Sequence, residues 1–566
     1  MSTVLLLIVL SGSLMAAAAV LAVHLQRVYA GTPGRALGWL RPVEYSIYRA
    51  LRVDPEHDMG WAQYARAVLS FSLVSALALY ALQRLQGALP LNPADMKGVR
   101  PDLAFNTAVS FVTNTNWQSY SPELTMSYLT QMAGLAVQNF ASGAVGMAVA
   151  VALVRGFCRS ESRGIGNFWA DLVRGMLYVL IPLALVIAVV LMARGAVQTF
   201  DGPVSVKTLS GATQTIARGP FAGQEAIKEL GTNGGGSFNA NSAHPYENPT
   251  PFTNLLEIFS LLLIPFAMPF LFGRMLGRMR EGIAILAAMV LLLGTAFGIS
   301  LASETRTTPA LTAAGLTHAA NMEGKEQRFS IQEAAIFSDS TTGTSTGAVN
   351  SMHDSFTAIG GAVPMTLILL GEVAPGGVGT GLYSILLFAT LTVFIAGLMV
   401  GRTPEFLGKS IGAREVKLAT LGVLVMPVGF LITVGLSSVL DAGLAGPLNA
   451  GPHGFSEILY AFASTWNNNG SAFAGLTAAT NYYDYLLGAA MVLGRFLVIL
   501  PALGLAGALA AQKTRPTSSG SMPTASPIFV GLLIGVILIL GGLQFFPALA
   551  LGPIVEHVLM HASATF

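Results

Sequence analysis

Residues 231–241 read GTNGGGSFNAN, a glycine-rich run between two apolar stretches that are long enough to cross a lipid bilayer. Three other stretches share its mixture of Thr, Asn, Ser and Gly: TNTNWQ at 113–118, TSTGAV at 344–349 and WNNNGS at 466–471. Each of them follows a stretch that can form a short helix and precedes a long apolar segment. We therefore expect the four stretches to be equivalent loops of one repeated structure.

The four loops recur at a nearly constant interval along the chain. Aligning Asn116, Gly234, Gly347 and Gly470 gives separations of 118, 113 and 123 residues. A period this regular indicates internal repetition rather than composition alone. We predict four helix–pore loop–helix units around a pseudo-fourfold pore, with one extra transmembrane helix at each end of the chain. The predicted units are 64–155, 168–280, 281–402 and 417–513, and the extra helices lie in 1–30 and 524–566.

The composition predicts a membrane protein. Of the 566 residues, 53% are hydrophobic and 10% are charged, whereas a soluble domain carries about 25% charged residues. We therefore predict an all-α polytopic membrane protein with ten transmembrane helices. The predicted spans are 3–23, 64–86, 124–154, 168–194, 255–273, 281–302, 356–400, 417–438, 484–511 and 527–550. A signal peptide is the alternative for the first span, but that span lacks a basic n-region, which favours a retained helix.

The distribution of Lys and Arg predicts the orientation, because cytoplasmic loops are enriched in these residues. The loops after the odd-numbered spans hold 18 of the 30 Lys and Arg residues, and the intervening loops hold nine. We therefore expect both termini and all four polar loops on the outer side of the membrane. The net charge of +2 gives no reason to expect nucleic-acid binding, and the single Cys158 excludes an intramolecular disulfide.

The chemistry of the four loops suits an ion filter. An ion that crosses a membrane loses its water shell, and rings of backbone carbonyl oxygens can replace it. Glycine permits the backbone conformations that this requires, and Thr and Asn side chains can satisfy the backbone groups behind the filter. The predicted filter residues are Asn114, Thr115, Asn116, Thr232, Asn233, Gly234, Ser345, Thr346, Gly347, Asn468, Asn469 and Gly470.

A short pore helix is expected before each loop, with the partial negative charge of its C-terminal end directed at the cation. The four predicted pore helices cover about 104–113, 222–231, 331–342 and 455–465.

Several polar side chains lie just beyond the loops and have two interpretations each. Gln118 either lines the outer mouth of the filter or donates a hydrogen bond to a neighbouring pore helix. Four others either concentrate cations or pair structurally with the next helix: His244, Glu247, His353 and Asp354. The histidines are too dispersed in the sequence to predict a metal site.

The seventh apolar span, 356–400, is too long for one perpendicular helix, since 45 residues would extend about 68 Å. The stretch GEVAPGGVGTG at 371–381 interrupts it with Pro375 and five glycines. We predict two half-helices joined by a loop near the membrane midplane, an arrangement that marks ion pathways in transporters. Glu372 in this loop is costly in lipid, so it should face a cavity or a basic partner.

The interrupted segment is a candidate inward barrier, together with two arginines near the inner ends of the second helices of units 3 and 4. The candidate barrier residues are Glu372, Gly376, Gly377, Arg402 and Arg495. The alternatives are a re-entrant loop without a gating role and arginines that only anchor their helices at the interface.

Longer strings of the sequence support a family resemblance. They are FVTNTNWQSYSPE (111–123), GTNGGGSFNANSAHPYENPT (231–250), NMEGKEQRF (321–329), GAVNSMHDSFTAIGG (347–361), GLMVGRTPEFLGK (397–409), GPHGFSEILYAF (451–462) and NNNGSAFAGL (467–476). With these strings the chain closely resembles the potassium-binding A subunits of bacterial Kdp potassium-transporting ATPases, which belong to the superfamily of four-repeat potassium transporters. One departure is local: where that family often has Ser-Cys-Gly, this chain has Ser345-Thr346-Gly347.

The resemblance implies a potassium-binding and translocating subunit of an ATP-driven, high-affinity uptake complex in the bacterial inner membrane. It implies three partners, namely a P-type ATPase subunit, a single-span C subunit and a small F peptide. The transported ion would be K⁺, held only at the filter residues, and it would leave sideways through a tunnel toward the ATPase subunit. The barrier segment and the two arginines would then block direct inward flow.

The chain lacks the DKTGT sequence of P-type ATPases and the GxxxxGK[ST] phosphate loop, so ATP hydrolysis is assigned to a partner. The alternative within the same superfamily is a self-sufficient potassium channel or cation symporter. A third hypothesis is a scaffold or a polysaccharide-type membrane enzyme that uses Glu372, Asp354 and His353.

Overall fold

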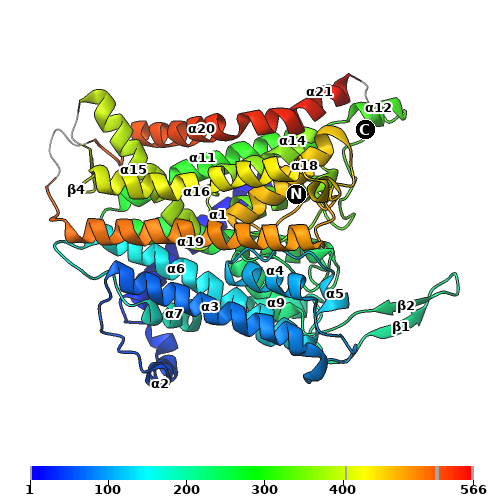
Figure 1. Ribbon diagram of the computed structural model, residues 1–566, viewed down its shortest axis with the longest axis horizontal. Helices are drawn as coiled ribbons and strands as arrows, with labels where there is room; N and C mark the ends of the chain where they lie inside the picture. Colours follow the sequence, from blue (N-terminus) through cyan, green and yellow to red (C-terminus); the bar gives the residue numbers. More distant parts are fainter. Residues whose placement is uncertain (1–2, 402–403, 517–521, 563–566) are drawn as a thin grey trace.

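The computed structural model describes residues 3–401, 404–516 and 522–562, and most of its long helices run along one common direction (Figure 1). Among the described residues, ten helices are long and apolar enough to cross a membrane. The sequence-based prediction of an all-α polytopic protein with ten membrane-spanning helices is therefore confirmed.

The order long helix, short helix, irregular loop, long helix occurs four times along the chain, and each occurrence is called a unit. Unit 1 consists of α3 (Trp61–Leu85), η2 (Gln86–Ala88), α4 (Pro101–Val112), α5 (Pro122–Thr125), η3 (Thr130–Ala136) and α6 (Val137–Cys158). Unit 2 consists of α7 (Phe168–Gly175), η4 (Met176–Leu180), α8 (Ile181–Ala193), β1 (Val204–Lys207), β2 (Thr213–Ile216), α9 (Ala222–Leu230), η5 (Asn241–Ala243) and α10 (Pro251–Met275).

The last two units follow the same order. Unit 3 consists of α11 (Met279–Glu304), α12 (Pro309–Ala313), α13 (Ile331–Gly343), η6 (His353–Ser355), α14 (Ala358–Leu369) and α15 (Thr380–Val400). Unit 4 consists of β3 (Glu405–Phe406), β4 (Lys409–Ser410), α16 (Ala413–Ser437), α17 (Asp441–Leu444), α18 (Gly451–Asn467) and α19 (Asn481–Ala511).

Additional helices flank the four units. At the N-terminal end they are α1 (Thr3–Tyr29), η1 (Arg35–Leu40) and α2 (Arg41–Leu51), and at the C-terminal end α20 (Pro527–Leu549), η7 (Ala550–Ile554) and α21 (Val555–His561). Helix α1 is longer than the predicted span 3–23 and packs against α10. Helix α2 was not predicted, because it is neither an apolar run of membrane length nor a short helix before one of the four polar loops.

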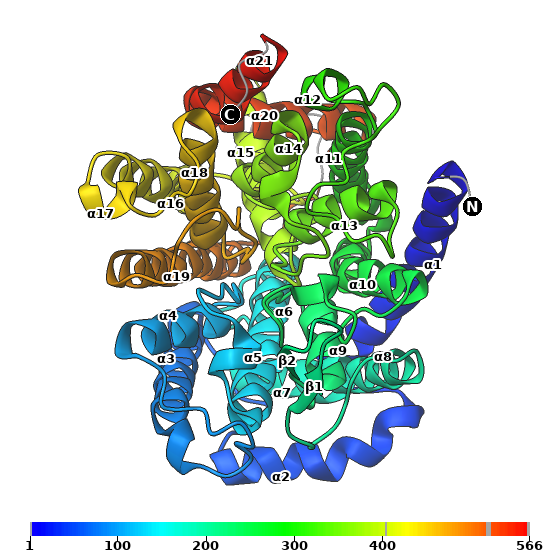
Figure 2. The same cartoon turned by 90° about the vertical axis from the view of Figure 1, so that its right-hand side faces the viewer.

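Seen from one end, the four units follow one another around a common centre (Figure 2). Helix α19 of unit 4 packs against α4 and α6 of unit 1, so the arrangement closes. The chain termini lie at the same end as the antiparallel β1–β2 hairpin, which projects beyond the helices (Figure 1). The hairpin spans 204–216, within the segment that joins α8 to α9.

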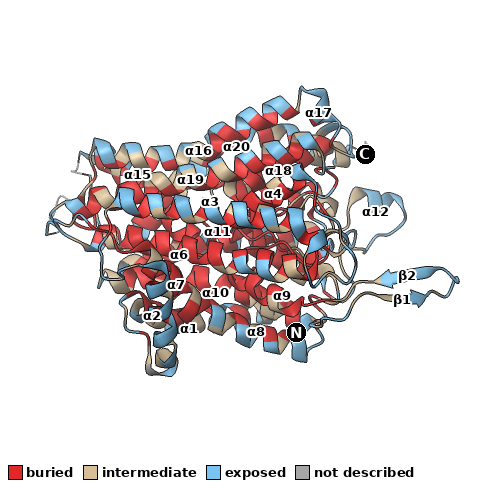
Figure 3. Ribbon diagram, turned by 60° about the horizontal axis from the view of Figure 1, so that its bottom comes forward, coloured by how far each residue is buried: buried red, intermediate tan, exposed pale blue. Residues whose placement is uncertain are grey.

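Helix α6 lies in the interior and is buried along most of its length (Figure 3). Its sequence VQNFASGAVGMAVAVALVRGFC is rich in Ala, Gly and Val on all sides, which is the pattern of a helix surrounded by other helices. Small residues let neighbouring backbones approach closely. At Gly156 an added Cβ would lie 2.7 Å from the Cα of Ala506 on α19.

Two predicted spans are not single continuous helices in the structure. Within 124–154, the membrane helix begins at Thr130, because Pro122–Thr125 forms a separate short turn and Met126 has an extended conformation (φ −112°, ψ 125°). Within 356–400, the predicted interruption is present, since α14 ends at Leu369 and α15 begins at Thr380.

Candidate functional site

Four short helices, one in each unit, end directly before the four polar loops. They are α4, α9, α13 and α18, and their bounds differ from the predicted pore helices by no more than a few residues. The loops that follow them are called loops 1 to 4.

The four loops share one backbone hydrogen bond. In each loop, the N–H of one residue donates to the carbonyl five positions earlier, near the end of the preceding short helix. The donors are Thr115, Asn233, Thr346 and Asn469, and the N···O distances are 2.9, 2.9, 2.8 and 2.8 Å. These four residues occupy the same column of the sequence alignment, one position before Asn116, Gly234, Gly347 and Gly470.

The loops also share a backbone conformation that is rare for residues other than glycine. The residue before each of these donors has a positive φ: 63° at Asn114, 46° at Thr232, 57° at Ser345 and 61° at Asn468. Two positions later φ is again positive in loops 1, 2 and 4, whereas Gly347 lies outside the left-handed region. When left-handed residues alternate with residues in other backbone conformations, successive peptide groups point in the same direction. A row of carbonyl oxygens can then face one centre.

Side-chain amides join loop 1 to loop 2. Asn114, Asn116 and Gln118 each donate to a backbone carbonyl exactly one alignment offset, 118 residues, further along the chain. The acceptors are Thr232, Gly234 and Gly236, at 3.0, 3.3 and 3.1 Å. Residues of loops 1 and 2 that the 118-residue repeat aligns are therefore hydrogen-bonded to each other in the structure.

The other neighbouring loops are also in contact, and the ring closes. The Gly347 N–H lies 3.4 Å from the Asn233 carbonyl, which joins loop 3 to loop 2. The Ser345 hydroxyl donates to the Asn468 carbonyl at 3.0 Å, and the Asn468 amide donates to the Thr115 hydroxyl at 2.9 Å. Loops 3 and 4, and loops 4 and 1, are thereby linked.

The local departure at Thr346 has a counterpart in loop 1. The Thr346 and Thr344 hydroxyls are 2.8 Å apart, and the Thr115 and Thr113 hydroxyls are also 2.8 Å apart. Threonine at this position therefore reproduces in loop 3 the hydrogen bond that loop 1 already makes.

A cavity of about 360 Å³ lies against the ring, and residues of all four loops line it, among them Asn116, Gly235, Gly347 and Gly470. Gln118 also lines this cavity while it donates to the Gly236 carbonyl. Gln118 thus lines this cavity and links loops 1 and 2, and its hydrogen bond across the units goes to a loop carbonyl rather than to a pore helix.

The segment between α14 and α15 lies against the ring. The Gly376 N–H donates to the Gly343 carbonyl at 2.7 Å, at the end of α13. The Val378 N–H donates to the Thr232 hydroxyl at 2.8 Å, and Glu372 accepts a hydrogen bond from the Asn469 amide at 2.7 Å. The segment is thus bonded to loops 2 and 4 and to the short helix of unit 3. Gly377 packs against the Thr344 carbonyl of loop 3.

Arg495 lies near the middle of α19 and is 4% exposed, so the predictions of a position at the inner helix end and of an interface anchor are wrong for this residue. The apolar length of α19 continues past Arg495 to Ala511, which carries the arginine into the interior. Arg495, Glu372, Tyr383 and Asn468 line one cavity of about 70 Å³ next to the ring. The other predicted barrier arginine, Arg402, lies outside the described residues.

The polar residues just beyond loops 2 and 3 are paired within the protein. Glu247 lies 2.7 Å from the Lys228 ammonium, and His353 is bonded to the Tyr460 hydroxyl at 2.9 Å. The His244 ring stacks on Phe238 with a centroid distance of 3.6 Å. These contacts agree with the interpretation that the residues pair structurally within the protein rather than concentrate cations.

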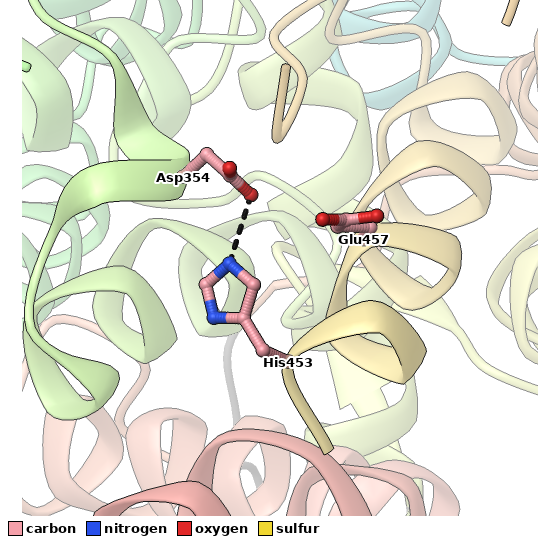
Figure 4. A group of neighbouring side chains, drawn as sticks. All are labelled: Asp354, His453 and Glu457. Atoms are coloured by element: carbon pink, nitrogen blue, oxygen red, sulfur yellow. Dashed lines mark hydrogen bonds and ion pairs between the residues drawn. The ribbon is translucent and has the colours of Figure 1, made fainter. Parts of the chain in front are cut away.

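Asp354 belongs to a charged cluster that the sequence did not reveal, since its partner His453 lies 99 residues away (Figure 4). His453 is bonded to Asp354 at 3.1 Å and to Glu556 of α21 at 2.8 Å, and the Glu457 carboxylate lies close by. The cluster ties α21 to units 3 and 4. The sequence signal was the stretch HGFSE, which places His453 and Glu457 one helical turn apart.

The charge of His453 gives a testable pH dependence. Burial lowers the pKa of His453, but hydrogen bonds to Asp354 and Glu556 outweigh it and raise the pKa to about 10. Because the pKa of His453 is higher in the folded protein than its unfolded value of about 6.5, protonation of His453 stabilises the fold. This stabilisation is fully present below about pH 6.5 and is lost as the pH rises through about 10. We expect His453→Gln to lower the thermal unfolding midpoint at pH 6 by about 1–3 °C, with a smaller difference at pH 10.

The matched control is His561→Gln, since among the described residues the exposed His561 is bonded to a carbonyl of its own helix and to no carboxylate. A difference between wild type and His453→Gln that stays constant from pH 6 to pH 10 would contradict this account of the cluster.

The fold and the ring define a class: multi-pass membrane proteins in which four helix–pore loop–helix units surround one pore. The family described as KdpA, potassium-transporting ATPase A subunit, matches residues 6–558, and the chain belongs to this family.

Relatives from several bacteria are similar over nearly the whole chain. A protein of Methylorubrum populi is 55% identical over 546 residues, covering 96% of this chain and 95% of its own length. A protein of Rhodospirillum centenum is 54% identical over 98% of this chain and 97% of its own length, and one of Ralstonia nicotianae is 52% identical over 95% and 96%. All three are named potassium-transporting ATPase potassium-binding subunit.

Proposed function

We propose that this chain is the potassium-binding and translocating subunit of an ATP-driven, high-affinity potassium uptake complex. The observation that carries the proposal is the closed ring of four loops with one shared hydrogen bond and one shared left-handed residue in each. Carbonyl rings of this kind replace the hydration shell of K⁺. The names of the relatives support K⁺ as the ion and an ATPase as the context.

The predicted filter residues carry K⁺ in this proposal, with backbone carbonyls as the ligands. The Asn and Thr side chains hold the loops in place and do not coordinate the ion in this proposal. The amides of Asn114, Asn116 and Asn468 are already bonded to neighbouring loops. Gln118 forms the outer mouth. The units are proposed to extend over 64–155, 168–280, 281–402 and 417–513.

The segment with Glu372, Gly376 and Gly377 is proposed to be the inward barrier, with Arg495 and Arg402 adding positive charge. Its support is the set of hydrogen bonds that hold the segment against the ring, and the cavity that Glu372 shares with Arg495. An ion stopped there would leave sideways toward the ATPase subunit.

The proposed partners are the P-type ATPase subunit, the single-span C subunit and the small F peptide, in the bacterial inner membrane. We propose that both termini face outward together with the four loops. The excess of Lys and Arg in the opposite loops supports this orientation, as does the position of both chain ends at the same end of the molecule as the hairpin (Figure 1).

The test compares the purified complex with the isolated chain in potassium-loaded vesicles. The complex is expected to hydrolyse ATP in response to micromolar K⁺ and to accumulate ⁸⁶Rb⁺ only with ATP, while the isolated chain gives no sustained flux. Rapid, ATP-independent potassium flux through the isolated chain would instead support the self-sufficient channel or symporter.

A further inference from the structure

Behind loop 2 lies a buried cluster of four glutamates around one lysine. Lys228, Glu225 and Glu229 come from α9, Glu257 comes from α10, and Glu247 comes from the segment between these helices. The five residues are all 0–1% exposed. Four carboxylates and one ammonium give the cluster a formal charge of −3 when all are ionised.

Lys228 compensates only one side of this cluster. Its ammonium lies 2.7 Å from both Glu225 and Glu247 and donates to the Asn241 side chain at 2.9 Å. Glu247 also accepts the N–H groups of Ser237 and Phe238, so its charge is well solvated by the protein.

The other carboxylates have far fewer partners. The single hydroxyl of Ser242 serves both Glu225 and Glu229, at 3.0 and 3.2 Å. Neither oxygen of Glu257 has a hydrogen-bond partner among the described residues, although the side chain is 0% exposed. One oxygen from each of Glu225, Glu229 and Glu257 lies within 4.8 Å of the others. A buried charge without a partner costs several kcal/mol, so another positive species is needed here.

The arrangement suits a hard divalent cation. Ca²⁺ binds six to eight oxygens at about 2.3–2.6 Å, so two ligands on opposite sides of one ion are about 5 Å apart, which three carboxylates within 4.8 Å can satisfy. One Glu225 oxygen pairs with Lys228, so bidentate Glu229 and Glu257, the other Glu225 oxygen and the adjacent Ser242 hydroxyl supply about six oxygens. Mg²⁺ usually retains several waters, which this dry site disfavours. A proton on Glu257 would have to be shared with Glu225 or Glu229, whose oxygens lie within 4.8 Å, and the thermal measurement below separates shared protons from a bound ion.

We propose that Glu225, Glu229 and Glu257 form a structural Ca²⁺ site that braces loop 2 of the ring. Lys228 connects this site to loop 2, because its backbone carbonyl accepts the N–H groups of Asn233 and Gly234 at 2.9 and 3.2 Å. The ion is distinct from transported K⁺, and the site stands whether or not the chain works in an ATP-driven complex.

The experiment uses the purified complex, stripped with EGTA and then dialysed against ⁴⁵Ca²⁺. Wild type is expected to bind one Ca²⁺ per chain, and Glu257→Gln and Glu229→Gln are expected to bind it at least tenfold more weakly. Glu333→Gln is the matched control: it neutralises a pore-helix glutamate of α13 that caps its helix, where glutamine also serves.

A second measurement needs no variant, in case a substitution prevents folding. EGTA is expected to lower the thermal unfolding midpoint of the wild-type complex, and Ca²⁺ but not Mg²⁺ is expected to restore it. The proposal is overturned if wild type binds no Ca²⁺, or if EGTA leaves its midpoint unchanged. A midpoint that rises in Glu257→Gln with or without EGTA would also overturn it, since shared protons would then explain the cluster.

Discussion

Replacing Gly470 with alanine is expected to weaken potassium binding by at least about 100-fold, which corresponds to about 2.8 kcal/mol. Gly470 has φ +97°, a conformation that residues with a Cβ rarely adopt. An added Cβ would also overlap the Thr115 carbonyl oxygen of the neighbouring loop. The change therefore displaces a proposed K⁺ ligand. The half-saturating K⁺ concentration for ATP hydrolysis by the complex measures the effect.

Gly294→Ala is the control for this substitution, since an added Cβ on α11 meets no atom within 4 Å. It should leave potassium affinity unchanged. If the half-saturating K⁺ concentration of Gly470→Ala lies within about twofold of the wild-type value, loop 4 does not contribute to the filter.

Replacing Arg495 with methionine is expected to raise passive potassium flux about tenfold or more. The side chain is buried beside the cavity that borders the ring, so its charge opposes a dehydrated cation there. Two unit charges about 10 Å apart interact by about 1.7 kcal/mol at an effective dielectric of 20, enough for a tenfold effect. The measurement is ⁸⁶Rb⁺ entry into vesicles containing the complex, with ATP absent.

Arg495→Lys keeps the positive charge and should stay close to wild type in the same assay. If Arg495→Met and Arg495→Lys both leave passive flux at the wild-type level, the arginine is not part of the barrier.

The four loops and their short helices could be predicted because local sequence determines them. Glycine and Asn favour the left-handed conformation that the loops contain, and a constant period places the loops in equivalent positions. The interruption between α14 and α15 could be predicted for a similar reason, since Pro375 and the surrounding glycines cannot continue a helix.

The contacts between units could not be predicted in this way. His453 meets Asp354 and Glu556 only after three separate helices pack together, and Arg495 is buried only because α19 crosses the interior. Helix α9 is the clearest case. Its charged residues give it an amphipathic pattern typical of a solvent-facing side, yet a short helix enclosed by longer ones has no such side.

The unlike loops have a consequence for how such a pore could be assembled. Gly234 packs against Gly347, and Gly347 against Gly470, at approaches that leave no room for a Cβ. Only loop 1 carries a side chain at this position, and Asn116 uses it to bond the Gly234 carbonyl. Four copies of unit 2 joined as a homotetramer would therefore lack that amide link. Because all four units belong to one polypeptide, the order of the four loops around the ring is fixed. After gene duplication, the loops could therefore diverge in sequence only once this order was set.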